Sequence, residues 1–217
     1  MSMAKNPNPA LRNHHTLYAG KSGTGKSQAL KQNKAVPSRG VRHILWDISH
    51  DHAKETTYYS NRNDFIDAIK KAVKTGRGFR IGWDGDSGPA DFEWFAAVVW
   101  AVLDGGKMTY VTIEELARCV ESVSRAAPNL RRLYNEGRKY GAILHAVTQR
   151  PQEIPKTVYD MCEIFWVGGQ KSASVKKFAE LLDIPETEVK GLRPMQFLYY
   201  DEASGEPAKR VELKYKK

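Results

Sequence analysis

The sequence predicts an α/β domain in which a largely parallel sheet lies between two layers of helices. Short apolar runs alternate with amphipathic stretches, a glycine-rich loop joins the first run to a helix, and acidic or amide residues end later runs. The 217 residues suffice for one domain with a substantial core. We expect a flexible arm over residues 1–14, the domain over 15–203, and a basic tail over 204–217 that contains an edge strand.

The apolar runs and amphipathic stretches place the elements in order. We predict strands over residues 15–19, 42–48, 79–83, 109–114, 142–148, 164–167 and 197–200. We predict helices over residues 26–35, 63–75, 92–103, 115–126, 129–140 and 172–182. In the fifth helix, Leu130, Leu133 and Tyr134 have the spacing of a buried stripe, with Pro128 at its start and Gly141 at its end.

The composition is that of a globular protein with an excess of basic residues. Lys and Arg total 34 against 25 Asp and Glu, which gives a net charge of +9. This excess favours a polyanionic partner but does not identify it. We find no signal peptide, and the longest apolar run, residues 92–103, is too short for a transmembrane helix. Cys119 and Cys162 have neither metal-binding nor disulfide spacing.

A glycine-rich loop, GKSGTGKS, follows the first predicted strand and has the P-loop pattern. Gly20, Gly23 and Gly25 would let the backbone take positive φ and turn its N–H groups toward phosphate oxygens. Lys26 would contact the β- and γ-phosphates, and the Ser27 hydroxyl would ligate Mg²⁺. A chance match is disfavoured by the strand before the loop and the helix after it. The predicted ATP-binding residues are Gly20, Lys21, Ser22, Gly23, Thr24, Gly25, Lys26 and Ser27.

Polar residues end two later strands. Glu114 would hold Mg²⁺, and Glu115 would polarise the attacking water as general base. Carboxylates also favour the first turn of a helix, and the two roles are compatible. Gln149, two residues before the strand-terminating Pro151, would sense the γ-phosphate or orient the water, unless it only closes the strand. Asp47 also ends a strand and would lie near the nucleotide.

Three segments resemble the HerA/FtsK superfamily of P-loop ATPases: GKSGTGKS, TIEEL, and EGRKYGAILHAVTQRPQEIPKTVYDMCEIFWVG. In its small size and its lack of added domains, the chain is most similar to the genome-packaging ATPases of internal-membrane double-stranded DNA viruses. The resemblance implies a three-layer P-loop NTPase fold of the RecA/ASCE type. It also implies a translocase that hydrolyses ATP with Mg²⁺ and packages double-stranded DNA into a capsid. Glu114 stands where Asp is commoner, and either carboxylate binds Mg²⁺.

The resemblance further implies a homo-oligomeric ring of five or six subunits, with capsid-vertex or membrane proteins of the virus as partners. It gives Arg138, in EGRKYG, the role of an arginine finger that completes a neighbouring subunit's site. Arg150 is the other candidate, and for either arginine a solvated cation is the alternative. The expected location is the cytoplasm of the infected host cell or the packaging vertex of the virion.

Other functions and features stay open. The chain could instead power assembly or secretion of a filamentous phage or conjugation-type apparatus at a membrane. A nucleotide switch or a kinase that transfers phosphate to an acceptor is a further alternative, and the kinase is disfavoured because it does not need a catalytic glutamate beside the magnesium carboxylate. The basic residues between the acidic pair and Gln149 indicate either a DNA-binding face or a solvated one. His50, Asp51 and His52 are interpreted as a polar loop rather than a metal site.

Overall fold

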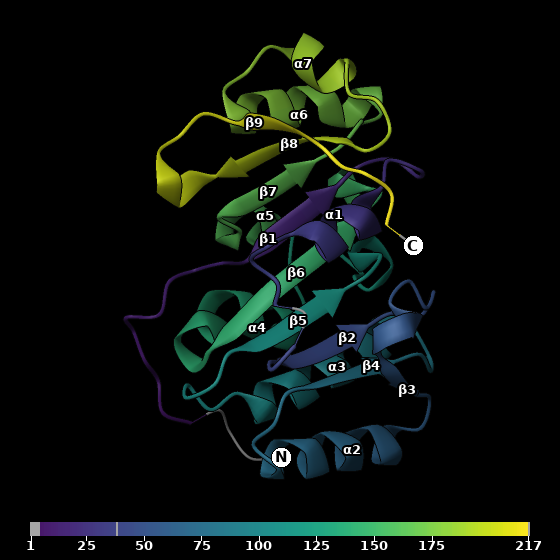
Figure 1. Cartoon of the computed structure of the whole chain (residues 1–217), viewed down its shortest axis with the longest axis vertical. Helices are drawn as coiled ribbons and strands as arrows, with labels where there is room; N and C mark the ends of the chain where they lie inside the picture. The colour runs from purple at the N-terminus through teal and green to yellow at the C-terminus, as the bar shows by residue number, and fades with distance from the viewer. Residues whose placement is uncertain (1–4, 38, 217) are drawn as a thin grey trace.

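The computed structural model describes residues 5–37 and 39–216, and within them nine strands form one sheet (Figure 1). Their order is β3-β4-β2-β5-β6-β1-β7-β8-β9. The first seven strands in this order are parallel to one another, whereas β8 pairs antiparallel with β7 and β9 pairs antiparallel with β8. The predicted, largely parallel sheet is confirmed. The strands are β1 (Thr16–Ala19), β2 (Arg42–Trp46), β3 (Thr57–Tyr59), β4 (Phe79–Trp83), β5 (Thr109–Ile113), β6 (Ala142–Thr148), β7 (Ile164–Val167), β8 (Gln196–Asp201) and β9 (Lys209–Glu212).

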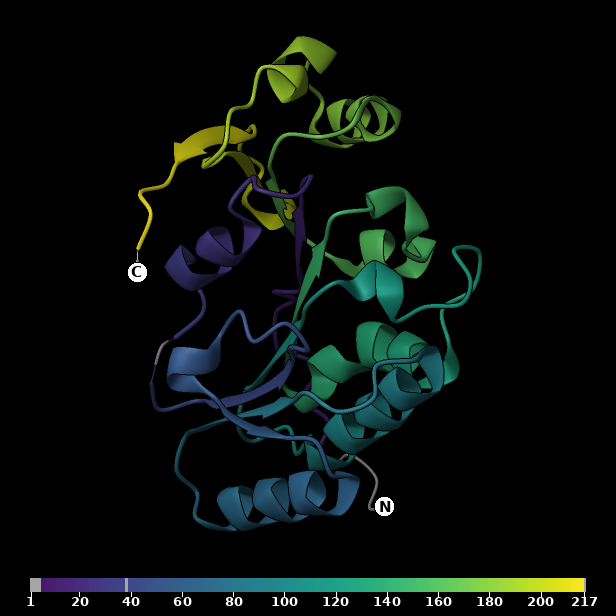
Figure 2. The same cartoon turned by 90° about the vertical axis from the view of Figure 1, so that its right-hand side faces the viewer.

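Helices cover both faces of the sheet. Figure 2 shows α1 on one side and α3, α4 and α5 on the other, which completes the three predicted layers. The α-helices are α1 (Lys26–Gln32), α2 (Arg62–Lys74), α3 (Pro89–Val102), α4 (Pro128–Glu136), α5 (Lys156–Met161), α6 (Ser172–Leu182) and α7 (Glu186–Lys190). Short 3₁₀ turns join several of them: η1 (Ala53–Glu55), η2 (Leu116–Arg118), η3 (Gly137–Tyr140), η4 (Pro151–Glu153) and η5 (Glu202–Ser204).

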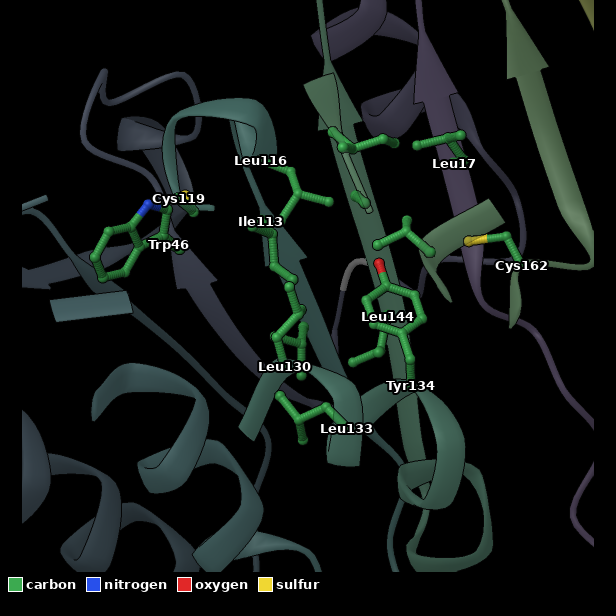
Figure 3. Packing of buried hydrophobic residues seen from close by; sticks show 14 of the residues in the cluster. Leu17, Trp46, Ile113, Leu116, Cys119, Leu130, Leu133, Tyr134, Leu144 and Cys162 are labelled. Carbon is green, nitrogen blue, oxygen red and sulfur yellow. The ribbon is translucent and has the colours of Figure 1, made fainter. Parts of the chain in front are cut away.

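The larger core lies between the sheet and the layer that contains α3 and α4. Leu130, Leu133 and Tyr134 of α4 are at most 2% exposed and point toward Ile113 and Leu144 of the sheet (Figure 3). The buried stripe predicted for this helix is therefore confirmed. The helix is amphipathic at the 3.6-residue period, so a single face is enough to fix it on β5 and β6.

The helix predicted over residues 115–126 is wrong. Only the short turn η2 forms there, because Glu115 adopts a left-handed conformation (φ 50°, ψ 47°) that an α-helix does not contain. Ser122 and Ser124 then bond to one another through their hydroxyls at 2.9 Å, which offers this segment an alternative to helical hydrogen bonds. The structure also adds elements that we did not predict: β3, α5 and α7.

The N-terminal segment lies along the domain. The Lys5 N–H donates to the Leu103 carbonyl at 3.2 Å, and the Asn8 N–H donates to the Lys139 carbonyl at 2.7 Å. At the other end of the chain, β9 is the expected edge strand, with the sequence KRVE. The division of the chain at residues 14 and 203 stays a prediction.

Three buried histidines make the free energy of unfolding depend on pH. Burial lowers the pKa of His15 and of His145 from 6.5 to about 3, and lowers the pKa of His43 well below 6.5. Below pH 6.5 the unfolded chain therefore binds more protons than the folded chain, and stability is lost as the pH falls. Between pH 7.5 and 5.5 we expect a loss of about 1.4 kcal/mol for each histidine.

Urea unfolding at these two pH values measures the effect. His145→Gln should reduce the pH-dependent loss by about 1.4 kcal/mol, because one titrating group has been removed. His14→Gln is the matched control, since His14 is exposed, and it should show the loss of the wild-type protein. The same pH-dependent loss in His145→Gln and in the wild type would contradict the assignment.

Candidate active site

The carboxyl ends of four neighbouring strands meet at one edge of the sheet. In the order β2-β5-β6-β1, the residues that follow these strands are Asp47, Glu114, Gln149 and the loop that begins at Gly20. Backbone hydrogen bonds join the ends, from the Glu114 N–H to the Trp46 carbonyl at 2.9 Å and from the Gly20 N–H to the Thr148 carbonyl at 3.2 Å. Parallel pairing thus brings together groups that are far apart in the sequence.

The P-loop, residues 20–27, joins β1 to α1. Gly23 (φ 77°) and Gly25 (φ 94°) have the expected positive φ. Gly20 does not, and that part of the prediction is wrong. Gly20 is needed for space instead, because a Cβ there would lie 2.6 Å from the Thr24 hydroxyl oxygen. That hydroxyl donates to the Lys21 carbonyl at 2.9 Å, which closes the loop on itself.

Residues that follow β7 and precede β8 support the P-loop, and the sequence analysis missed them. The Lys21 N–H donates to the Gly169 carbonyl at 2.9 Å, and the Met195 N–H donates to the Thr24 carbonyl at 2.9 Å. Met195 has a positive φ of 67°, and its sulfur would lie 2.6 Å from a Cβ on Gly25. The only signal in the sequence was the glycine pair after β7, which also occurs in ordinary turns.

Lys26 is 8% exposed, and its side chain lies in an acidic surrounding. Burial lowers the pKa of Lys26, and the negative charges of Glu115, Glu114 and Asp51 act in the opposite direction. Its Nζ donates to the Lys21 carbonyl at 3.4 Å. The ammonium group is therefore held at the loop, beside carboxylates and away from bulk water.

Glu114 belongs to a buried polar network. It is 5% exposed, and its Oε1 is hydrogen-bonded to His52 Nε2 at 2.8 Å. Burial raises the pKa of Glu114, and the bond to His52 opposes that rise. Asp47 fixes the loop that carries His52, because its carboxylate accepts the Asp51 and His52 N–H groups, both at 3.0 Å, and the Tyr58 hydroxyl. The interpretation of residues 50–52 as a polar loop missed this buried contact.

Glu115 is held in a conformation that few non-glycine residues adopt. Left-handed backbone costs about 1–2 kcal/mol for such a residue and tends to mark functional positions. The Gln149 amide nitrogen donates to Glu115 Oε1, so the ends of β5 and β6 are joined by these two side chains. The structure brings Lys26, Glu114, Glu115 and Gln149 together at the P-loop.

The two candidate arginine fingers lie in different places. Arg138 precedes β6, whose seven residues span about 23 Å, so it lies at the opposite end of this strand from Gln149. Its guanidinium donates to the carbonyls of Pro9, at 2.9 Å, and Leu11. Arg150 directly follows Gln149, is 67% exposed, and pairs with Glu153 at 3.3 Å. Arg138 therefore does not belong to its own chain's site.

The donor groups fit a magnesium–nucleoside triphosphate. Backbone N–H groups in a positive-φ glycine loop at the start of a helix suit phosphate oxygens, and the Lys26 ammonium adds a positive charge. A hydroxyl on Ser27 and a carboxylate on Glu114 are hard oxygen ligands of the kind that Mg²⁺ prefers. Within the described residues, no cluster of three or more His, Cys, Asp and Glu side chains offers another metal site.

The fold and the P-loop together define the class of P-loop NTPases. The chain belongs to the family of protein P9 of Pseudoalteromonas phage PM2, to which it is 33% identical over 214 residues, 96% of this chain and 94% of P9. No protein-family model matches the chain.

Solved structures share the fold at low sequence identity. The genome packaging NTPase B204 of Sulfolobus turreted icosahedral virus 2, in complex with AMPPCP, has a TM-score of 0.75 at 15% identity, over 94% of this chain and 99% of B204. VirB4 of Thermoanaerobacter pseudethanolicus has a TM-score of 0.62 at 10% identity, over 100% and 96% of the chains. The Type VII secretion ATPase EccC of Thermomonospora curvata has a TM-score of 0.54 at 13% identity, over 94% of this chain and 24% of EccC.

None of the helices in the described part of the chain has the length and apolar character needed to cross a membrane. The run over residues 92–103 lies within α3, where Phe92 and Phe95 pack on Trp46 with ring centroids 5.2 and 5.3 Å apart. Its apolar character thus serves the core.

The contact between His52 and Glu114 can be tested by stability. His52→Leu leaves a buried carboxyl oxygen without this partner, so the free energy of unfolding should fall by about 1–3 kcal/mol. Lys54→Ala is the control, because Lys54 is an exposed residue of η1, two residues after His52. The control should stay within about 0.5 kcal/mol of the wild type in urea unfolding. Equal effects of the two substitutions would show that the buried bond contributes nothing.

Proposed function

We propose that this protein is an ATP-driven translocase that packages double-stranded DNA into a viral capsid, working as a ring of identical subunits. The P-loop faced by the acidic pair and Gln149 carries the proposal, because this set supports hydrolysis rather than binding alone. The likeness to B204, described as a genome packaging NTPase, covers nearly the whole of both chains and supports the same role. The proposed location is the host cytoplasm or the packaging vertex, where capsid or membrane proteins of the virus would be partners.

Each group at the site has a proposed task. The P-loop backbone and Lys26 hold the β- and γ-phosphates, and Ser27 and Glu114 hold Mg²⁺. Bound Mg²⁺ neutralises charge that develops on the phosphate oxygens. Glu115 accepts a proton from the attacking water, and Gln149, bonded to Glu115, orients that water or reports the γ-phosphate. The strained backbone of Glu115 keeps its carboxylate at the end of β5.

Arg138 is proposed to complete the site of a neighbouring subunit. Two neutral carbonyls hold its guanidinium, and among residues 5–37 and 39–216 no carboxylate forms an ion pair with it. A phosphate group would therefore be its first charged partner, and phosphate accepts guanidinium hydrogen bonds strongly. The +9 net charge supports a polyanionic partner, and exposed Arg131 and Arg125 are candidate contacts for the DNA backbone.

A second candidate function is an ATPase that powers assembly or secretion of an apparatus at a membrane. The likeness to EccC, described as a Type VII secretion ATPase, favours it. The two functions share the hydrolytic site and differ in the partner that stimulates it. Double-stranded DNA should stimulate the packaging enzyme only.

ATP hydrolysis with and without double-stranded DNA tests the proposal. We expect hydrolysis that rises when DNA is added, and no hydrolysis by Lys26→Ala, because backbone groups cannot replace the ammonium on the γ-phosphate. Lys31→Ala is the matched control, since Lys31 is an exposed lysine of the same helix, and it should hydrolyse ATP like the wild type. Hydrolysis by Lys26→Ala would contradict the P-loop site, and a wild-type rate indifferent to DNA would contradict translocation.

The role of Arg138 can be tested by mixing two variants. Glu115→Gln should bind ATP but hydrolyse it about 10²–10⁴-fold more slowly, as expected for a lost general base. Arg138→Ala should also bind ATP and hydrolyse it poorly, because a finger acts on the transition state. In a mixed ring some interfaces pair an intact Glu115 with an intact Arg138, so part of the activity should return. Full activity of Arg138→Ala alone, or no recovery in rings shown to be mixed, would exclude the finger and leave Arg150 as the candidate.

A further inference from the structure

The chain returns to the P-loop after its last strand. Both views show the C-terminal segment beside α1 (Figures 1 and 2). The Leu213 N–H donates to the Met195 carbonyl at 2.9 Å, and the Met195 N–H donates in turn to the Thr24 carbonyl at 2.9 Å. The antiparallel pairing of β8 and β9 causes this return, because it brings the end of β9 beside the start of β8. Met195 thus links Leu213 to the P-loop backbone through two successive hydrogen bonds.

Two glutamines of α1 hold the segment that follows. Gln32 Nε2 donates to the Lys214 carbonyl at 2.8 Å. Gln28 makes two bonds with Lys216, since its Nε2 donates to the Lys216 carbonyl at 2.9 Å and its Oε1 accepts the Lys216 N–H at 3.0 Å. Gln28 is 7% exposed as a result. Residues 213–216, the C-terminal segment, therefore have a defined place on the helix that begins at the P-loop.

This place lies on the nucleoside side of the proposed ATP site. β1 lies between β6 and β7, and the acidic pair and Gln149 are on the β6 side. If the γ-phosphate faces those groups, the other end of the triphosphate must leave the loop toward β7, β8 and the C-terminal segment. Gln28 directly follows Ser27, in the first turn of α1, where backbone N–H groups face the phosphates. The segment thus lies where the nucleoside leaves the phosphate cradle.

Tyr215 is the residue of this segment suited to a base. Its side chain is 74% exposed, the highest value among the exposed large hydrophobic residues of the described chain, and the backbones of Lys214 and Lys216 on either side are held on α1. An exposed aromatic ring on a fixed backbone loses little freedom on binding and presents a face to a planar ligand. Stacking of a base on such a ring contributes about 1–3 kcal/mol.

We propose that the C-terminal segment forms the nucleoside-binding side of the ATP site and that Tyr215 stacks on the purine base. The inference rests on the proposed ATP-binding function and adds the residue that contacts the nucleoside. The phosphates are then held by the P-loop and the base by the end of the chain, with α1 linking the two.

Binding of two ligands tests the inference: ATP with Mg²⁺, and inorganic tripolyphosphate with Mg²⁺, which has the phosphates but no nucleoside. Isothermal titration calorimetry gives the dissociation constant of each. Tyr215→Ala should weaken ATP binding about tenfold and leave tripolyphosphate binding unchanged. Tyr215→Phe keeps the ring and should bind ATP like the wild type. Lys214→Ala is the matched control, because it removes the neighbouring exposed side chain but keeps the carbonyl that bonds to Gln32.

The outcomes separate the inference from the function on which it rests. If Tyr215→Ala binds ATP and tripolyphosphate with the same ratio of affinities as the wild type, the contact between Tyr215 and the base is wrong. The P-loop site would not be contradicted by that result. Equal weakening of both ligands would also overturn the base contact, since the segment would then act through the shape of the P-loop. If the wild-type protein binds neither ligand, the ATP site itself is wrong. The same selective loss of ATP in Lys214→Ala would show that Tyr215 has no special part.

Discussion

The geometry of the site depends on the pairing of β1 between β6 and β7. All four residues of β1 are buried, and Ala19 lies opposite Thr148 on one side and Val167 on the other. The P-loop therefore starts where both neighbouring strands end, and the Gly168 N–H donates back to the Ala19 carbonyl at 2.8 Å. A slip of one residue would move the loop by about 3.3 Å and turn every side chain of β1 to the other face of the sheet. The register is thus protected by the core on both faces.

Around this strand the protein keeps several ionisable groups out of water. Lys26 and Glu114 are both less than a tenth exposed, and Asp47 is fully buried. Such groups are stable only when they have partners. The loop after β2 supplies backbone N–H groups to Asp47 and the His52 side chain to Glu114, and the Lys21 carbonyl accepts a bond from Lys26. In our proposal the bound phosphates would add negative charge beside Lys26, and Mg²⁺ would add positive charge beside Glu114.

The sequence predicted what local patterns determine. Apolar runs located six of the seven parallel strands, all except β3, and the glycine spacing located the loop at Gly23 and Gly25. The failures have two physical causes. One is a backbone outlier: Glu115 is left-handed, so an amphipathic stretch that suits a helix does not form one. The other is contact over a long separation. His52 contacts Glu114 across a separation of 62 residues in the sequence. Met195 contacts Thr24 because β8 pairs antiparallel with β7, and no sequence motif predicts either contact. Site roles inferred from motifs remain predictions until the variants are measured.

Both edges of the sheet are ill suited to accept a further strand. At one edge β3 has three residues, and at the other β9 reads KRVE, with Lys209 and Arg210 paired to Glu206 and Glu188. A short edge and a charged edge both oppose the stacking of strands from other molecules. Copies of this protein crowded at high local concentration are therefore kept from growing into β-aggregates. We therefore expect copies of this protein to associate through helices and loops rather than through added strands.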